Sequence, residues 1–300
     1  FGASMVAVLL ALVVWFTMGL NYGIDFRGGT TLRTQSDAPV DVAAYRTALA
    51  PLQLGDISIS EVYDPASNSK KHVAMVRIQA QEGEEAATPE MISQVEGALK
   101  TVAPNIVFTS VESVGPKVSG ELIQTAFLAV AASLGAILIY IWLRFEWQFS
   151  LGAVAALFHD VILTIGIFSV LQIRFDLPVI AAILTIIGYS INDTVVIFDR
   201  LRENLRKYKK RDLREIMNLS VNETLSRTLM TSGTTLLALL ALLFLGGDVI
   251  RGFVFAITWG VIVGTYSSVY VAKNIVLFLG VKRDWSKKDN NTGQYANIDA

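Results

Sequence analysis

Acidic and hydroxyl side chains interrupt a segment that is otherwise apolar enough to lie in a membrane. The stretch "GYSINDTVVIF" (188–198) carries Ser190, Asn192 and Asp193 within its apolar run. A charged side chain near the centre of a bilayer costs at least about 2.5–3.5 kcal/mol, so it is retained where it has a partner or a function. Asp193 is therefore the first candidate for an ion- or proton-binding group.

The spacing around Asp193 indicates what chemistry it could support. Tyr189 and Ser190 precede it by four and three residues, which puts the three side chains on one face of a helix. Asn192, Asp193 and the nearby hydroxyls could ligate sodium as well as pass protons, so the coupling ion stays open between H⁺ and Na⁺. The alternative is structural, because a polar side chain can also hold a membrane bundle together by bonding to another helix.

A second polar stripe begins at Arg227. Thr231, Thr234 and Thr235 follow it at positions i+4, i+7 and i+8, which is the spacing of one helix face. Since the two helices are expected to be antiparallel, Arg227 should reach the depth of Asp193, where opposite charges reduce each other's burial cost. We therefore expect a hydrated lining between the two helices. Arg227 could instead extend to the cytoplasmic surface, and the threonines could serve packing alone.

Asp160 in "FHDVILT" (158–164) is a third candidate, because it falls near the middle of another apolar segment. His159 beside it would point about 100° away on a helix, so we do not expect the two side chains to face one cavity. The chain has no cysteine, and neither G-x-S-x-G nor H-E-x-x-H is present. We therefore expect no enzymatic activity, no catalytic residues and no bound metal or cofactor.

The composition defines the setting in which these residues act. Of the 300 residues, 53% are hydrophobic and only 17% are charged, which is typical of an integral membrane protein. The net charge of -1 gives no general attraction to nucleic acid. A membrane span takes about 20 helical residues, and the candidate spans are 1–20, 122–143, 150–171, 177–199, 224–246 and 251–280. Because Phe1 already lies inside the first, we expect a short N-terminal piece to precede it.

Basic residues define the expected orientation. The predicted loop 200–223 and the predicted tail 281–300 are rich in lysine and arginine, and the positive-inside rule assigns both to the cytoplasm. Both chain ends are then cytoplasmic, and residues 21–121 form one domain on the outer side of the membrane.

The predicted outer domain has the order β-α-β-β-α-β. Alternating and periodic patterns predict strands at 30–35, 56–63, 72–80 and 105–115 and helices at 39–52 and 88–102. This is the order of a ferredoxin-like fold. Gly28 and Gly29 are interpreted as a tight turn, since no phosphate-binding motif surrounds them. The expected fold is a membrane all-α bundle of six transmembrane helices with one extracytoplasmic α+β domain.

Five motifs together closely resemble the SecF family of bacterial protein-export membrane proteins, in the resistance-nodulation-division superfamily. They are "NYGIDFRGGT" (21–30), "VESVGPKVSGEL" (111–122), "FHD" (158–160), "GYSINDTVVIFDRLREN" (188–204) and "LSRTLMTSGTT" (225–235). The resemblance implies that the family's key intramembrane carboxylate falls on Asp193 and its key basic residue on Arg227. Arg27 departs from the pattern, because a small residue is common there.

The resemblance also implies a place in the Sec machinery of the bacterial plasma (inner) membrane. There the chain would bind SecD beside the SecYEG channel, with YajC and YidC as further candidate partners. Proton or sodium motive force would drive the late, ATP-independent translocation of an unfolded exported polypeptide. Two alternatives stay open, a non-conducting structural subunit of a translocon and half of another resistance-nodulation-division exporter. Such an exporter would normally carry two large outer domains and twelve spans.

Overall fold

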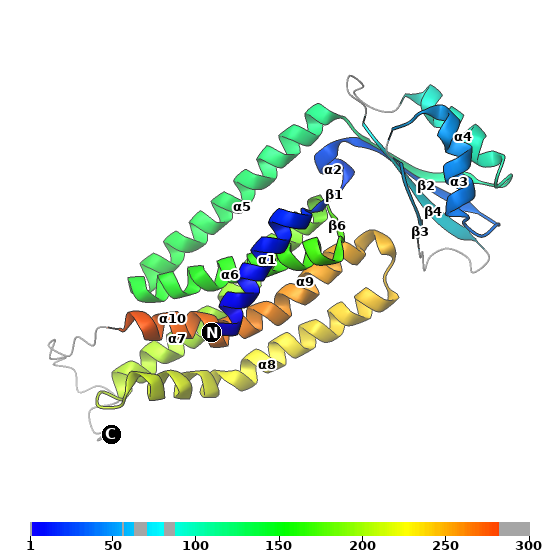
Figure 1. Ribbon diagram of the computed structural model, residues 1–300. Coiled ribbons are helices and arrows are strands. Elements are labelled where there is room, and N and C mark those ends of the chain that lie inside the picture. The colour runs from blue at the N-terminus through cyan, green and yellow to red at the C-terminus, as the bar shows by residue number, and fades with distance from the viewer. Residues whose placement is uncertain (1, 56, 63–70, 81–87, 282–300) are drawn as a thin grey trace.

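The computed structural model describes residues 2–55, 57–62, 71–80 and 88–281. It has two parts, a bundle of long helices and a small α/β domain at one end of the bundle (Figure 1). Both α1 (Gly2–Met18) and α5 (Pro116–Arg144) lead from the bundle toward this domain. The tail predicted at 281–300 lies outside the described residues except for Val281.

Five helices within the described residues are long and apolar enough to cross a membrane. They are α5, α6 (Trp147–Leu171), α7 (Leu177–Lys207), α8 (Leu213–Leu245) and the continuous helix formed by α9 (Asp248–Ser267), the π-helical turn η2 (Ser268–Ala272) and α10 (Lys273–Leu279). The first of the six predicted spans is shorter: α1 has 17 residues, or about 26 Å at 1.5 Å per residue. The chain is therefore a multi-pass membrane protein with five long apolar helices and one shorter apolar helix.

The shorter helix α1 packs closely against α6. A Cβ atom at Gly166 would overlap the Cβ of Ala11, so the two backbones approach where glycine leaves room. Ser169 of α6 donates a hydrogen bond of 2.6 Å to the carbonyl of Gly19, just after α1. The first predicted segment is thus part of the bundle, as a helix that ends at Met18.

The basic segment that the sequence predicts as a loop at 200–223 is mostly helical. α7 continues and α8 starts early, so the connection is limited to residues 208–212. The Asp212 carboxylate caps α8 by accepting a backbone N–H at 3.0 Å. Arg200 pairs with Glu223 across the two helices at 2.6 Å. Because opposite charges meet there, both helices can extend beyond the apolar region.

The α/β domain is a four-stranded antiparallel sheet with two helices on one face. The strands β2 (Gly29–Ser36), β3 (Ile57–Val62), β4 (His72–Gln79) and β5 (Val107–Val114) pair in the order β3-β4-β2-β5, and the helices are α3 (Val42–Leu49), continued by η1 (Ala50–Leu52), and α4 (Pro89–Lys100). Asp41 and Thr88 cap the helices by accepting backbone N–H groups. Leu32 and Leu99 are fully buried between sheet and helices. The predicted β-α-β-β-α-β order is confirmed.

A short segment attaches this domain to the bundle. β1 (Asn21–Tyr22) pairs in parallel with β6 (Arg174–Phe175) in the α6–α7 connection, and the helical turn α2 (Ile24–Arg27) follows β1. The Asp25 carboxylate accepts a hydrogen bond of 3.1 Å from the backbone N–H of Leu177 and so caps α7. Gly29 has a φ of 138°, and a Cβ there would meet the carbonyl of Ile78. Gly29 is therefore required by a close backbone approach at the start of β2.

Candidate functional site

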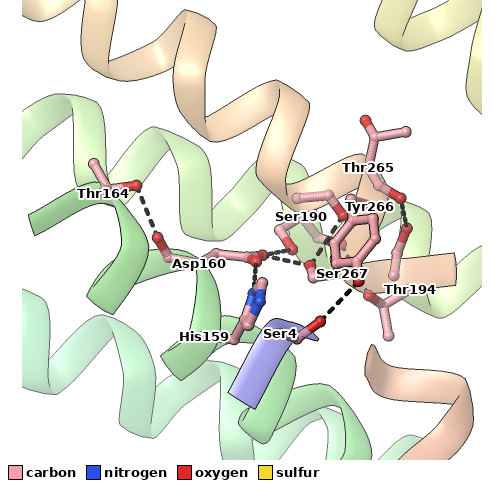
Figure 2. A network of polar contacts seen from close by, with 11 residues as sticks. Ser4, His159, Asp160, Thr164, Ser190, Thr194, Thr265, Tyr266 and Ser267 are labelled. Atoms are coloured by element: carbon pink, nitrogen blue, oxygen red, sulfur yellow. Dashed lines mark hydrogen bonds and ion pairs between the residues drawn. The ribbon is translucent and has the colours of Figure 1, made fainter. Parts of the chain in front are cut away.

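Asp160 is the centre of a buried polar network that joins three helices (Figure 2). Its side chain, on α6, is only 1% exposed. Oδ2 accepts hydrogen bonds from Ser190 Oγ of α7 at 2.6 Å and from Ser267 Oγ of α9 at 2.8 Å. Two hydroxyl donors from different helices therefore offset the cost of burying this carboxylate.

His159 belongs to the same network, contrary to the expectation from the sequence. Its Nδ1 lies 2.9 Å from Asp160 Oδ1, although the two residues are adjacent on α6. The 100° spacing separates their Cβ directions, but side-chain rotation still brings the ring and the carboxylate together. His159 Nε2 is buried and has no hydrogen-bond partner in the part of the chain that the structure describes. His159 is therefore a site residue that the spacing argument missed.

The network continues to α1 through Tyr266. The rings of His159 and Tyr266 stack with their centroids 6.2 Å apart. The hydroxyl of Tyr266 lies 2.8 Å from Ser4 Oγ, near the start of α1. A continuous set of contacts thus runs from α7 through α6 and α9 to α1.

Glycines of α9 allow these helices to approach one another. A Cβ at Gly264 would lie 3.2 Å from Ser190 Cβ and 3.6 Å from Asp160 Oδ2. One turn earlier, a Cβ at Gly260 would overlap the side chain of Ile186. The π-helical turn η2 begins one turn after Gly264, and such turns are frequent at functional sites.

Asp193 is buried in α7 and keeps an unused oxygen. Its side chain is 5% exposed, and Oδ2 has no hydrogen-bond partner within residues 2–55, 57–62, 71–80 and 88–281. Ser190 lies one turn earlier on the same helix and is bonded to Asp160, so the two intramembrane carboxylates occupy successive layers of the bundle. An unpaired carboxylate at this depth needs a proton, a cation or a partner group.

Thr228 of α8 lies on the turn that faces Asp193. Tyr189 Oη donates a hydrogen bond of 3.3 Å to Ser232 Oγ, which defines the register of the antiparallel helices α7 and α8. Asp193 is four residues after Tyr189, and Thr228 is four residues before Ser232, so both lie one turn from this bond. Thr228 is 1% exposed, and its Oγ1 also lacks a partner among the described residues. Two unsatisfied oxygens therefore occupy facing turns.

Arg227 does not pair with Asp193 in this structure. Among the described residues, the ion pairs within 4.0 Å do not include one between these two side chains. Arg227 is instead exposed on α8. Neighbouring helical residues point about 100° apart, so burying Thr228 turns Arg227 outward. Arg227 and Asp193 therefore form no direct ion pair within this chain, although the positive charge of Arg227 is still near enough to act on the Asp193 carboxylate.

The predicted threonine stripe does not line a path between α7 and α8. Thr231 and Thr234 are exposed and Thr235 is half-buried. Their hydroxyls donate to carbonyls one turn earlier in α8, at 3.1, 2.8 and 2.8 Å. The buried hydroxyl residues of α8 are Ser220, Thr224, Thr228 and Ser232, so the inward face is displaced by about one residue from the predicted one.

An outward polar face results on one side of the α7–α8 pair. Asn192 is exposed on α7. Asn192 immediately precedes the inward-facing Asp193, and Arg227 immediately precedes the inward-facing Thr228. Because α7 and α8 are antiparallel, both side chains then point to the same side of the helix pair. Thr231 and Thr234 point to that side as well. We call Asn192, Arg227, Thr231 and Thr234 the outward polar face.

The arrangement restricts the chemistry of the site. The described residues contain no group of three or more His, Cys, Asp or Glu side chains that could hold a metal ion. The site contains two buried carboxylates and one imidazole, which are side chains of the type that exchange protons, and the carboxylate and hydroxyl oxygens could ligate a monovalent cation. The site therefore fits ion or proton exchange.

Two family models match the chain. Residues 94–282 match the model described as "Protein export membrane protein SecD/SecF, C-terminal". Residues 13–40 match the "SecD/SecF GG Motif", which includes the glycine pair before β2. These matches cover the outer-domain entry and most of the bundle.

The chain is also similar to individual proteins of known sequence or structure. It is 67% identical over 301 residues to the protein translocase subunit SecF of Cereibacter sphaeroides, covering 100% of this chain and 93% of that one. It is 42% identical to the subunit of the same name from Vibrio alginolyticus, covering 94% and 87%. The crystal structure of SecDF, a translocon-associated membrane protein from Thermus thermophilus, superposes with a TM-score of 0.82 at 38% identity. This chain covers 37% of that SecDF chain, which is therefore much longer.

Proposed function

Because the chain belongs to the SecD/SecF family of protein-export membrane proteins, as a relative of its SecF translocase subunits, we propose that it couples ion flow to protein export. In this proposal it acts with a SecD-like partner beside the SecYEG channel. Proton or sodium motive force drives the late, ATP-independent translocation of an unfolded polypeptide. The family is one of transporter components, and no catalytic role is proposed.

The observation that carries the proposal is the unsatisfied carboxylate of Asp193. Its Oδ2 is buried opposite Thr228 Oγ1, which is also unsatisfied within the described residues. A bound proton or cation would neutralise the buried carboxylate, and its release would restore the costly unpaired charge. A site with two such states can be loaded from one side of the membrane and emptied to the other.

The outward polar face supports a second membrane subunit. Lipid offers no hydrogen-bond partner to the Arg227 guanidinium or the Asn192 amide, so both favour contact with protein. The similar SecDF chain is much longer than this one, so it contains further segments that could form a SecD-like half at this face. Polar groups of that partner would then complete the ion path beside Asp193. YajC and YidC remain candidate partners from the resemblance alone.

The polar network supplies a route from the ion site to the outer domain. Ser190 lies one turn from Asp193 and is bonded to Asp160, and the contacts continue through Tyr266 to Ser4 of α1. Since α1 and α5 both lead to the α/β domain, a shift of α7 against α6 would move that domain (Figure 1). Loading and release at Asp193 would thereby drive a cycle of outer-domain positions.

The proposed topology has both chain ends in the cytoplasm of a bacterial cell and the α/β domain outside its plasma membrane. The basic connection between α7 and α8 lies at the opposite end of the bundle from the α/β domain (Figure 1). Positive charge concentrates on the cytoplasmic side of membrane proteins. This separation supports the orientation.

Asp193→Asn tests the proposal, because it keeps the side-chain shape and removes the titratable charge. In vesicles that hold the complete complex, we expect the variant to assemble normally and late export to fall to the rate seen without an ion gradient. Asp199→Asn is the matched control on the same helix, since Asp199 is half-exposed and pairs with Arg144 at 2.6 Å. Exposed pairs contribute little, so its export should stay within about twofold of wild type.

The same vesicles distinguish the alternatives. A proton gradient alone, a sodium gradient alone and no gradient identify the coupling ion. An Asp193→Asn complex that still exports at the wild-type rate would support the non-conducting structural subunit instead. Gradient-driven efflux of a small molecule without export of polypeptide would support the exporter half.

A further inference from the structure

A large cleft lies between the α/β domain and the outer ends of the bundle helices. It has a volume of about 1020 Å³. One wall is the face of the sheet that α3 and α4 do not cover, and the other is formed by the α6–α7 connection, the end of α8 and the start of α9. Ligand sites in proteins are typically about 300–1,000 Å³, so this cleft can hold more than a single ion or headgroup.

The sheet wall is polar because strand residues alternate between two faces. Leu32 and Val76 point into the core under α3 and α4, which turns their neighbours Thr31, Arg33 and Arg77 toward the cleft. Ser110 and Glu112 of β5 pair with Arg33 and Thr31 of β2, which places them on the same face of the sheet. Ser60 of β3 completes this wall.

The opposite wall is largely apolar. Leu243 and Phe244 at the end of α8 and Phe253 and Phe255 of α9 line it. Phe244 is 75% exposed, although it is large and hydrophobic. An extended peptide turns successive side chains to opposite sides, so one side can meet the polar strand face and the other the aromatic wall.

The cleft is lined by equal numbers of acidic and basic side chains, and some of its hydrogen-bond donors have no partner among the described residues. Four acidic residues and four arginines line it: Asp25, Glu61, Glu112, Asp176, Arg33, Arg77, Arg174 and Arg251. Burial, with Arg174 nearby, lowers the pKa of Arg77 to about 10. Arg77 Nε and Thr31 Oγ1 are buried without a hydrogen-bond partner among the described residues. Arg174 Nε lies 3.3 Å from Asp176 Oδ2, as an ion pair without hydrogen-bond alignment.

We propose that this cleft binds a short extended segment of the exported polypeptide. The proposal rests on the proposed function for the identity of the ligand and adds the surface that holds it. Hydroxyl and guanidinium groups that line the sheet wall can donate hydrogen bonds to the main-chain carbonyls of an extended chain, and its apolar side chains match the aromatic wall. Balanced charge favours a ligand of variable sequence over a phosphate group, which would need a net positive site.

Single cysteines test the proposal, because the chain contains none. Ser60→Cys and Ser110→Cys place a thiol in the cleft, while Ser93→Cys on exposed α4 is the control across the sheet. In vesicles with the complete complex, an export substrate is stalled with one cysteine in its emerging part. We expect disulfide yields at least fivefold higher at both cleft positions than at Ser93. Equal yields at all three, or none in the cleft while gradient-driven export proceeds, would overturn the proposal.

The same vesicles separate this proposal from the proposed function. If the substrate cross-links to the cleft but export does not depend on the ion gradient, the result supports the cleft proposal and contradicts ion coupling. If there is neither cross-linking in the cleft nor gradient-dependent export, the result contradicts both proposals. Arg77→Gln removes the buried cation and should lower the cleft yields and the late export rate at least threefold. A photoactivatable anionic phospholipid that labels the cleft, in place of the substrate, would also overturn the proposal.

Discussion

Ser190 of α7 donates a hydrogen bond of 2.6 Å to Asp160 of α6, one helical turn before Asp193 on the same face. This bond connects the two intramembrane carboxylates through a single turn of α7. A change at Asp193 that moves or rotates α7 must therefore lengthen or break the bond to Asp160. The relationship makes the strength of the Ser190–Asp160 contact a measurable part of the coupling.

Ser190→Ala removes one donor from the buried Asp160 carboxylate. We expect the variant to lose about 1–3 kcal/mol of stability, because Asp160 is left less completely satisfied. Gradient-driven export should fall more than export without a gradient. The thermal unfolding midpoint of the purified complex and the two export rates provide the measurement. Thr185→Ala is the control on α7, since Thr185 is exposed and bonds only to its own helix. Equal effects of the two changes would argue against the coupling role.

Gly264→Ala should destabilise the bundle, whereas Gly233→Ala should not. A Cβ at Gly264 would lie 3.2 Å from Ser190 Cβ and would press α9 away from α7. Overpacking of this kind costs about 1–3 kcal/mol. A Cβ at Gly233 of α8 meets nothing within 4 Å, so alanine there should be neutral or stabilise by up to about 1 kcal/mol. Thermal unfolding in detergent compares the two, and similar midpoints for both variants would refute the packing argument.

The outward polar face should be the contact surface of a SecD-like partner. Thr231→Cys lies on that face, and Leu229→Cys is its control on the opposite side of the α7–α8 pair at similar depth. Both positions are exposed in this chain, Leu229 at 56%. We expect a short bifunctional thiol reagent to join Thr231→Cys to single cysteines placed along the partner's facing helices. Preferential cross-linking from Leu229→Cys would place the partner on the wrong side for this proposal.

Opposite labelling of two cysteines would establish the orientation. Ser93→Cys lies on exposed α4 of the α/β domain, and Lys210→Cys lies in the basic α7–α8 connection. A membrane-impermeant maleimide added to intact cells lacking an outer permeability barrier should modify Ser93→Cys only. Lys210→Cys should react only after the membrane is opened. Labelling of both positions from outside would contradict the proposed topology.

Asp176, in the α6–α7 connection next to the α/β domain, should make a pH-dependent contribution to stability. Burial raises the pKa of its carboxyl group, although Arg174 opposes this. The folded chain then holds that proton more tightly than the unfolded chain, so the contribution is full below about pH 4 and is lost as pH rises through the raised pKa. Asp176→Asn lacks this loss. Its thermal unfolding midpoint should therefore rise relative to that of the wild-type chain as the pH rises through that window. At higher pH the difference between the two midpoints should stay constant. Parallel profiles would contradict the assignment.

The sequence by itself determined the features that depend on local pattern. Long apolar runs define the spans, because the length of a helix that crosses hydrocarbon is fixed by its rise per residue. Strand alternation and helical periodicity define the order of the outer domain. Asp160 and Asp193 stand out as candidates, because a carboxylate in an apolar run is costly wherever the helix is placed.

Only the tertiary structure decided which side each membrane helix presents to its neighbours. Lipid is as apolar as the bundle interior, so the hydropathy of α8 does not reveal which face is buried. Packing of α8 against α7 buries Thr228 and Ser232 and turns Arg227 outward, against the predicted pairing with Asp193. The contact of His159 with Asp160 and the donors Ser190 and Ser267 likewise depend on helix rotation and on the close approach at Gly264. Such long-range contacts are not encoded in any single stretch, because they arise where helices distant in sequence meet.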